Sequence, residues 1–325
     1  MLKNIKSKSK IKDKFKFIDL FAGIGGTRMG FERVGGKCVF TSEWDSFCQQ
    51  TYEANFGEIP FGDITKIKEK DIPDFDILIA GFPCQPFSSI GKRQGFMHAT
   101  QGTLFYDVLR IIKHKKNKAF LLENVQGLTT HNNGDTFKTI LEALDEIGYK
   151  VFYKILNSSD YGVPQQRKRI YMVGFRKDLF KKNKKEIEFN FPEGLKDKVF
   201  INSYLEKNIK GYSISKKLQD GYLFKKDDGR PIVVDKNSKI QVKTLVSSYH
   251  KIQRLTGTFV KDGETGLRLL TKNECKAIMG FPEDFIIPVS RTQMYRQMGN
   301  SVVVPVIEAI ASEILKTLKK AKLLD

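Results

Sequence analysis

The feature that most constrains the fold of this chain is the alternation of short apolar runs with longer amphipathic stretches over its first half. Apolar residues recur every three or four positions from Thr103 to Lys113 and from Asp135 to Gly148, which predicts helices. The intervening apolar runs predict buried parallel strands: FKFIDLFAG, KCVFTSEW, DFDILIAGF, KAFLLENV and KRIYMVGF. Strands that alternate with crossover helices indicate the α/β class, so we expect a doubly wound, mostly parallel sheet.

The alternation breaks down in the second half of the chain. A lysine-rich stretch is followed by glycine-containing turns and short β-like runs, which predicts a separate, β-rich lobe at residues 186–290. A helical pattern returns from Thr271 to Met279, and residues 302–318 predict a terminal helix that packs back on the first domain. The lobe is therefore expected as an insertion, with the main domain formed by residues 1–185 and 291–325.

The charge balance favours a polyanionic partner. Lysine and arginine number 56 against 37 acidic residues, which gives a net charge of +19. A lysine-rich composition gives the same excess of positive charge even when no polyanion is bound. The charge therefore favours nucleic acid as the partner but does not establish it. The scattered cysteines and histidines predict no metal site, and no apolar run is long enough to span a membrane. We expect a cytoplasmic protein without a membrane partner.

The first predicted strand ends in a glycine turn, Phe21-Ala22-Gly23-Ile24-Gly25-Gly26. Such a turn lets the backbone approach a ligand closely before a helix begins. The turn does not complete the dinucleotide fingerprint, because Arg28 stands where the last glycine belongs. By itself it is equally well explained as a tight strand-to-helix connection.

Acidic and aromatic residues follow the second strand. Glu43 at the end of that strand suits the two hydroxyls of a ribose, and the Trp44 indole suits an adenine face. Asp63 suits the amino group of an adenine. Singly, each has a structural explanation as a cap, a solvated charge or a core aromatic. Together, in successive loops, they predict a nucleoside site.

A thiol lies in the loop after the third strand, in Gly81-Phe82-Pro83-Cys84-Gln85-Pro86. The carboxyl ends of strands face the active-site crevice in sheets of this kind, so Cys84 is a candidate nucleophile. The other three cysteines, Cys38, Cys48 and Cys275, are expected to be buried and inert.

The ordered motifs resemble those of the DNA cytosine-C5 methyltransferases, in the compact form found in bacterial restriction-modification systems. The resemblance covers nearly the whole chain, in the family's order and at similar spacings. The motifs that carry it are DLFAGIGG, SEWD, GDIT, GFPCQPFS, GTLF, LLENV, QQRKRIYMVGF, RLLTKNECKAIMGFP and QMGNSVVVP. The fold that it implies is that of the S-adenosylmethionine-dependent methyltransferases, with residues 186–290 as a target-recognition domain.

The resemblance implies four catalytic residues. Cys84 matches the family's nucleophile, which adds to C6 of cytosine, and Glu123 matches the residue that holds N3 and the exocyclic amine. Arg167 and Arg169 alternate along a predicted strand and so are expected to point the same way, the second towards the base O2. Their alternative explanation is exposed charge at a strand edge. The cytosine would have to be flipped out of its duplex.

The methyl donor implied by the resemblance is S-adenosylmethionine, with no metal. The residues expected to bind it are Phe21, Gly23, Gly25, Glu43, Trp44, Asp63, Ile64, Leu104 and Asn300.

Contacts to DNA are expected from two places. A lid loop, Ser89 to Gln101, would close over the flipped base, although Gln101 stands where relatives carry an arginine. The Thr244-Leu245 pair resembles the anchoring motif of the recognition domain, and base-reading side chains are expected beside it, although a polar lobe surface looks similar. The residues predicted to contact DNA are Ser88, Lys92, Arg93, Thr244, Ser247, Tyr249 and Arg254.

Three other functions fit parts of the sequence: an RNA cytosine methyltransferase of the same fold, a DNA-binding protein that has lost catalysis, and a nicotinamide-dependent oxidoreductase. The favoured hypothesis is a monomeric enzyme acting on double-stranded DNA. A cognate restriction endonuclease acting independently is a further partner that the resemblance allows.

Overall fold

The computed structural model describes residues 14–83 and 104–324. In these residues a six-stranded sheet has the order β2-β1-β3-β4-β7-β5. Its strands are β1 (Phe15–Leu20), β2 (Gly36–Ser42), β3 (Ile77–Ala80), β4 (Ala119–Val125), β5 (Tyr149–Asn157) and β7 (Lys168–Arg176). The first four are mutually parallel, as predicted. The doubly wound, mostly parallel α/β class is therefore confirmed.

Two details of the sheet differ from the prediction. The run KRIYMVGF forms β7, which is antiparallel to both β4 and β5, so its expected parallel direction is wrong. Residues 158–167 join β5 to β7, which is too short a connection for a crossover helix, and the chain must turn back. β5 was not predicted, because it is an edge strand whose polar and apolar residues do not form a continuous buried run.

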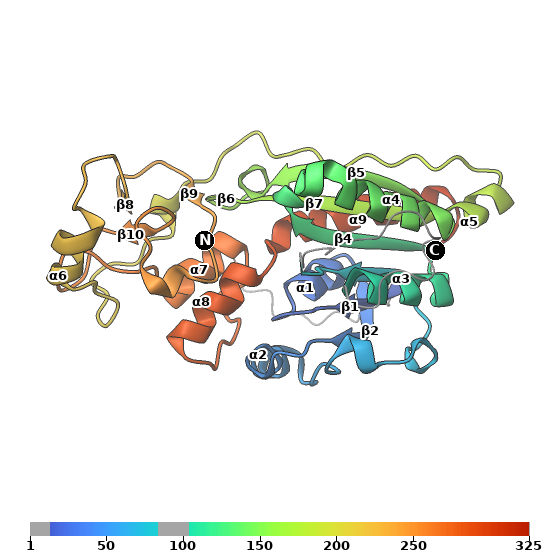
Figure 1. Cartoon of the computed structure of the whole chain (residues 1–325), viewed down its shortest axis with the longest axis horizontal. Coiled ribbons are helices and arrows are strands. Elements are labelled where there is room, and N and C mark those ends of the chain that lie inside the picture. Colours follow the sequence, from blue (N-terminus) through green and yellow to red (C-terminus); the bar gives the residue numbers. More distant parts are fainter. Residues whose placement is uncertain (1–13, 84–103, 325) are drawn as a thin grey trace.

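Helices cover both faces of the sheet (Figure 1). Consecutive residues of β7 point to opposite faces of the sheet, because Val173 packs in one apolar cluster and Met172 in the other. The first cluster includes α1 (Gly26–Arg33) and α9 (Val304–Lys320), and the second includes α3 (Leu104–Lys115) and α4 (Asp135–Glu146). Helices α3, α4 and α9 confirm the predicted helical stretches to within a few residues.

Within the described part of the chain, three further helices have eight or more residues. They are α2 (Ser46–Phe56), α7 (Lys272–Met279) and α8 (Arg291–Asn300). α7 begins at a capping box, in which Thr271 accepts from the backbone of Glu274 and the Glu274 carboxylate accepts from that of Thr271. A short helix, α5 (Lys177–Lys182), lies at the opposite end of the molecule from the small lobe (Figure 1).

The small lobe has less regular β structure than the sequence led us to expect. Its described strands are short: β8 (Ile232–Val234), β9 (Val242–Lys243) and β10 (Thr258–Val260), with α6 (Lys216–Leu218) as a single helical turn. β8 pairs with β10, whereas β9 pairs with β6 (Gln165–Gln166) of the main domain. Irregular chain, held by buried side-chain hydrogen bonds, makes up most of the lobe.

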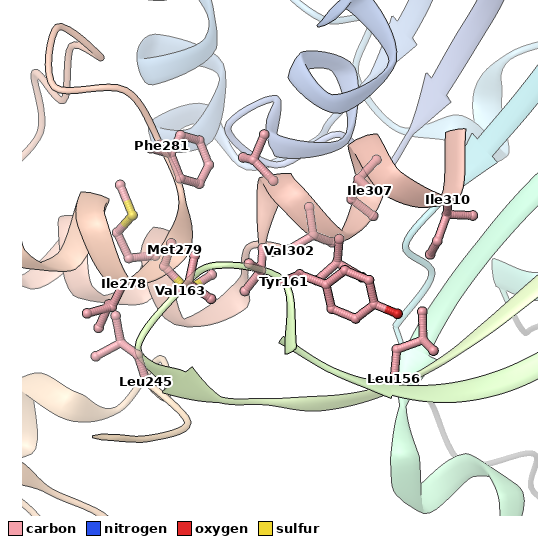
Figure 2. Close-up of a cluster of buried hydrophobic side chains, with 14 of the residues drawn as sticks. Leu156, Tyr161, Val163, Leu245, Ile278, Met279, Phe281, Val302, Ile307 and Ile310 are labelled. Carbon is pink, nitrogen blue, oxygen red and sulfur yellow. The ribbon is translucent and has the colours of Figure 1, made fainter. Parts of the chain in front are cut away.

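The apolar core runs without interruption from the main domain into the small lobe. Figure 2 shows the junction, where Val163 and Val302 of the main domain meet Leu245 and Ile278 of the lobe. Because these side chains belong to one buried cluster, the two parts share packing and are not joined by a linker alone. The domain boundary at residues 186–290 stays a prediction.

Candidate active site

A cavity of about 890 Å³ lies at the carboxyl ends of β1 to β4. Its walls come from loops that are distant in the sequence, which the parallel strands bring to one edge of the sheet. The residues predicted to act here that line it are Phe21, Gly23, Glu43, Trp44, Asp63, Ile64, Leu104, Glu123, Arg167, Arg169 and Asn300. Gly25 does not line the cavity. Its backbone conformation shapes the glycine turn behind the wall.

The glycine turn forms one wall and adopts an unusual backbone. Gly23 and Gly25 have positive φ angles of 55° and 86°, and so does Phe21 at 57°. A Cβ at Gly25 would lie 2.2 Å from a ring atom of Phe56. Glycine is therefore required at position 25 both by conformation and by space. The left-handed Phe21 is strained for a side chain of its size and lies directly against the cavity.

Glu43 fastens this turn to the end of β2. Its Oε2 accepts from Gly23 N at 2.8 Å and its Oε1 from Asp45 N at 2.9 Å. Burial raises the pKa of Glu43, while these two N–H donors oppose the shift. A carboxylate has about four acceptor positions, so lone pairs remain for hydroxyl groups in the cavity. The neighbouring Trp44 is 77% exposed, which leaves its ring face open.

The third loop is fixed by polar contacts of its own. Asp63 Oδ1 accepts from both the backbone N and the Oγ1 of Thr65, and these bonds lower the pKa of Asp63. Arg110 on α3 donates to Ile64 O at 2.7 Å and pairs with Asp107. Ile64 is thus held in place by Arg110, which sequence reasoning missed because it belongs to no recognised motif, and Asp63 is held by its bonds with Thr65.

Glu123 and Arg169 form an ion pair inside the cavity. Arg169 Nε lies 3.1 Å from Glu123 Oε1, and the two side chains come from neighbouring antiparallel strands, β4 and β7. Burial raises the pKa of Glu123, and Arg169 and Arg167 oppose the shift. A partly buried carboxyl beside a fixed guanidinium provides a proton donor or acceptor next to a cation.

The chain approaching Cys84 lies beside this pair. A Cβ at Gly81 would stand 3.7 Å from Glu123 Oε2, and Asn124 Nδ2 donates to Phe82 O at 2.9 Å. Pro83, the last described residue of this segment, lines the cavity. The predicted residues Cys84, Ser88, Lys92 and Arg93, with the lid from Ser89 to Gln101, lie outside the described residues.

The two predicted arginines are not equivalent. Arg167 precedes β7, is 3% exposed and donates to three backbone carbonyls, those of Leu245, Gly299 and Ser301. Both arginines line the cavity and both oppose the raised pKa of Glu123, as expected of side chains that point the same way. They differ in their partners, because the Nη atoms of Arg167 are bonded to these carbonyls whereas Arg169 pairs with Glu123. Burial, together with Arg169, lowers the pKa of Arg167 to about 10.

The residues predicted to contact DNA from the small lobe divide into two groups. Thr244 and Ser247 are partly exposed, and Thr244 Oγ1 donates to Gln166 O. Tyr249 and Arg254 are buried, so the structure contradicts their predicted role as base readers. The polar character of the segment suggested a surface, whereas the fold turns both side chains inward.

Each of these buried side chains has structural partners. The Tyr249 hydroxyl donates to Thr258 O at 2.6 Å and accepts from Leu270 N at 3.0 Å. Arg254 pairs with Asp228, and its Nε donates to Leu223 O at 2.9 Å. Both residues therefore hold irregular parts of the lobe together.

Burial disfavours the thiolate form of the three described cysteines. It raises the pKa of Cys38 to about 12 and raises the pKa values of Cys48 and Cys275 well above the ordinary value of a thiol. Cys275 is fully buried, as expected, but Cys38 and Cys48 are only partly buried, and Cys48 lines the cavity. A thiol that stays protonated is a poor nucleophile.

Within residues 14–83 and 104–324, no group of three or more histidine, cysteine or acidic side chains is placed to hold a metal ion. No helix among these residues is long and apolar enough to cross a membrane.

Comparison with known proteins decides the family. The model of the family described as C-5 cytosine-specific DNA methylase matches residues 15–316. The chain belongs to this family. The methylase is 61% identical to type II methyltransferase M.MspI of Moraxella sp over 94% of this chain and 71% of the relative. It is also 61% identical to M.BsuFI of Bacillus subtilis, over 95% of this chain and 75% of the relative.

Solved structures agree on the fold. DNMT2 of Spodoptera frugiperda matches with a TM-score of 0.74 at 24% identity, covering 94% of this chain and 99% of that one. DNMT2 of S. pombe matches with a TM-score of 0.73 at 22% identity over the same shares. At these identities the likeness shows the methyltransferase fold and nothing finer.

The resemblance inferred from the motifs is thereby confirmed. The chain is an enzyme, a DNA cytosine-C5 methyltransferase, and its relatives connect it with DNA methylation in restriction-modification. Membership of this family excludes the nicotinamide-dependent oxidoreductase.

Proposed function

We propose that this methylase transfers a methyl group from S-adenosylmethionine to C5 of a cytosine flipped out of a specific double-stranded DNA site. The observation that carries the proposal is the Glu123–Arg169 pair, 3.1 Å apart, in the same cavity as the glycine turn and Glu43. This arrangement places groups suited to a cytosine ring beside groups suited to a nucleoside.

The cavity fits the proposed methyl donor. Its volume of about 890 Å³ accommodates a nucleoside with an amino-acid tail. Glu43 would hold the ribose hydroxyls, the open face of Trp44 would cover the adenine, and Asp63 would accept from the adenine amino group. When bound, the donor supplies an electrophilic methyl group. Phe21, Gly23, Ile64, Leu104 and Asn300 complete the proposed site.

The protein's residues would activate the cytosine, whose C5 is a poor nucleophile. The Cys84 thiolate forms a bond to C6, and the ring electrons shift towards C5 and N3. Glu123 is suited to share its proton with N3 at that moment, because burial raises its pKa. Arg169 would hold O2 and keep the ring in place. After methylation, a water molecule takes the C5 proton, the electrons of that C–H bond form the C5–C6 double bond and expel the Cys84 thiolate, and N3 returns its proton to Glu123, which restores the aromatic ring.

Recognition of DNA is proposed for residues 186–290, with residues 1–185 and 291–325 as the catalytic domain. Ser247 lies against Gly299 of the cavity wall, Thr244 is bonded to Gln166 O, and both are proposed to contact DNA near the flipped base. The net charge of +19 suits the phosphate backbone. The proposal includes a monomer that acts on DNA in the cytoplasm, at the nucleoid, independently of any cognate endonuclease.

Bisulfite sequencing of a plasmid recovered after expression tests the activity and identifies the methylated site. We expect one short sequence to carry C5-methylcytosine. Cys84→Ala should abolish methylation, whereas the control Cys38→Ala, which changes a thiol held protonated outside the cavity, should retain it. Methylation by Cys84→Ala at the normal rate would overturn the nucleophile assignment. Methyl transfer to folded RNA but not to duplex DNA would favour the RNA alternative.

A further inference from the structure

One buried side chain contacts two segments that are far apart in the sequence. Arg167 Nη1 donates to Leu245 O at 3.1 Å, within residues 242–247, which we call the anchor segment. Its Nη2 donates to Gly299 O at 3.1 Å and Ser301 O at 2.7 Å, within residues 299–302, which we call the cofactor-side segment. The first segment belongs to the small lobe, and the second contains Asn300 of the cavity wall.

The neighbours of Arg167 fix the anchor segment to the main domain. β6 pairs with β9, so Gln165 and Gln166 lie opposite Val242 and Lys243. Gln165 Oε1 accepts from Leu245 N at 2.7 Å. Residues 165–167 therefore hold the anchor segment by backbone and side-chain bonds together, which leaves it little freedom to move alone.

The two segments also touch directly at Gly299. A Cβ built on this residue would lie 2.2 Å from Ser247 N and 2.3 Å from the carbonyl carbon of Val246. Real Cβ atoms essentially never come closer than 3.0 Å to another atom, so only glycine allows this contact. Because backbone lies against backbone, a displacement of the cofactor-side segment must displace the anchor segment as well.

The cofactor-side segment in turn lies against the glycine turn. A Cβ at Gly26 would meet Ser301 Oγ at 2.9 Å and Val302 Cγ2 at 3.0 Å. A ligand that orders the glycine turn and Asn300 therefore also orders Ser301, to which Arg167 is bonded. The contacts form a continuous route from the cavity to Ser247, a predicted DNA contact.

The hydrogen bonds of Arg167 are directed to carbonyls of the protein. Both Nη atoms donate to backbone, and its Nε is buried without a hydrogen-bond partner among the described residues. A planar guanidinium can bridge carbonyls on two segments at once, which a single lysine ammonium does much less well. These contacts suit a residue that sets the relative position of two segments.

We propose that Arg167 is a positioning residue that, with Gly299, couples cofactor binding in the cavity to DNA binding by the small lobe. The inference rests on the proposed function, since it takes S-adenosylmethionine and duplex DNA as the two ligands. A ligand that restricts the motion of the cofactor-side segment also restricts the anchor segment. The anchor segment then loses less conformational entropy when it binds DNA. Each ligand must then raise the affinity of the other by the same factor.

The test is the ratio of DNA dissociation constants without and with saturating S-adenosylhomocysteine. It uses fluorescence anisotropy and a duplex that carries the site found by bisulfite sequencing. For the unmodified chain we expect tighter DNA binding with this ligand, within the range of about 5- to 150-fold typical of coupled sites. Calorimetry of the same ligand with and without DNA should give the same ratio.

Two variants disrupt the contacts between the anchor segment and the cofactor-side segment. Arg167→Lys removes the planar fork, and Gly299→Ala forces Gly299 and Ser247 apart. In each, the ratio should fall towards one, whatever the change in the affinity for either ligand alone, because the ratio compares DNA binding by the same variant with and without the second ligand. The matched controls are Arg33→Lys, on the exposed face of α1, and Gly127→Ala, where an added Cβ meets nothing within 4 Å. Both controls should keep the full ratio.

The outcomes separate this inference from the proposed function. An unmodified chain with a ratio of one, or folded variants that keep its ratio, would overturn the coupling even if DNA is methylated. A chain that neither binds S-adenosylhomocysteine nor methylates DNA would overturn the proposed function itself. Thermal unfolding of both variants establishes which of them is folded, and the ratio of the unmodified chain tests the coupling without either variant.

Discussion

At the scale of single residues, burial and partners decide what an ionisable side chain does. Arg169 faces the cavity and pairs with Glu123, whereas Arg254 is turned into the small lobe and pairs with Asp228. Arg268, fully buried, is satisfied by Asp262 and Glu274. These arginines look alike in the sequence, yet the folded chain gives one a position beside the proposed substrate and makes the others internal supports.

Asp19 provides a prediction at this scale. It lies fully buried on β1 behind the glycine turn, accepts from Thr27 Oγ1, and has a second oxygen, Oδ1, for which the described residues supply no partner. Burial raises its pKa to about 7. Because an unfolded chain ionises this group near pH 4, the folded state binds more protons between about pH 4 and 7, and stability falls as pH rises through that window.

Asp19→Asn removes this dependence. Relative to the variant, the unmodified chain should lose about 2–3 kcal/mol of unfolding free energy between pH 5 and 7. Urea unfolding at several pH values measures the difference. The fully exposed Asp74, changed to Asn, serves as a control with no comparable trend. A difference between Asp19→Asn and the unmodified chain that is independent of pH would contradict the assignment.

At the scale of elements, capping and connection length explain where helices and strands begin and turn. The short connection between β5 and β7 makes the end of the sheet antiparallel, and this is what brings Arg169 opposite Val125 and close to Glu123. α7 begins at Thr271 because its capping box closes there. The glutamate of that box, Glu274, also receives both Nη atoms of Arg268 at 2.8 Å.

Glu274→Gln tests the importance of this buried pair. The change leaves the charge of Arg268 only partly balanced by Asp262, in a place from which water is excluded. We expect a loss of about 3–5 kcal/mol in unfolding free energy, measured by urea denaturation. Glu264→Gln, at an exposed position of the same lobe, should change stability by less than about 0.5 kcal/mol. Equal effects of the two changes would disprove a special role for Glu274.

At the scale of the whole molecule, two lobes share one apolar cluster, and the candidate active-site cavity lies close to their junction. The buried cluster that joins them includes residues from both, and β6 pairs across the same junction (Figures 1 and 2). A DNA duplex bound between lobes held in this way would meet a surface with a defined geometry. The excess of 19 positive charges would contribute attraction that does not depend on sequence.

Salt should therefore weaken binding strongly. If DNA affinity rests on 6–10 phosphate contacts, it should fall by about 10³–10⁵ between 50 and 200 mM salt. Anisotropy titrations at several salt concentrations measure how the logarithm of the affinity falls with the logarithm of the salt concentration. They use the duplex with the methylated site and an unrelated duplex. The unrelated duplex should show a similar slope at lower affinity, because phosphate contacts carry no sequence information. Affinity that does not change with salt would contradict a phosphate-based interface.

The sequence by itself determined the α/β class, most strand and helix positions, and the family, because apolar periodicity and motif spacing are local properties. It also named eleven of the described residues that line the cavity, from Phe21 to Asn300. Only the tertiary structure decided the direction of β7, the inward orientation of Tyr249 and Arg254, and the contacts of Arg167 with carbonyls at 245, 299 and 301. These features depend on which segments meet in space, and no local pattern of residues records that.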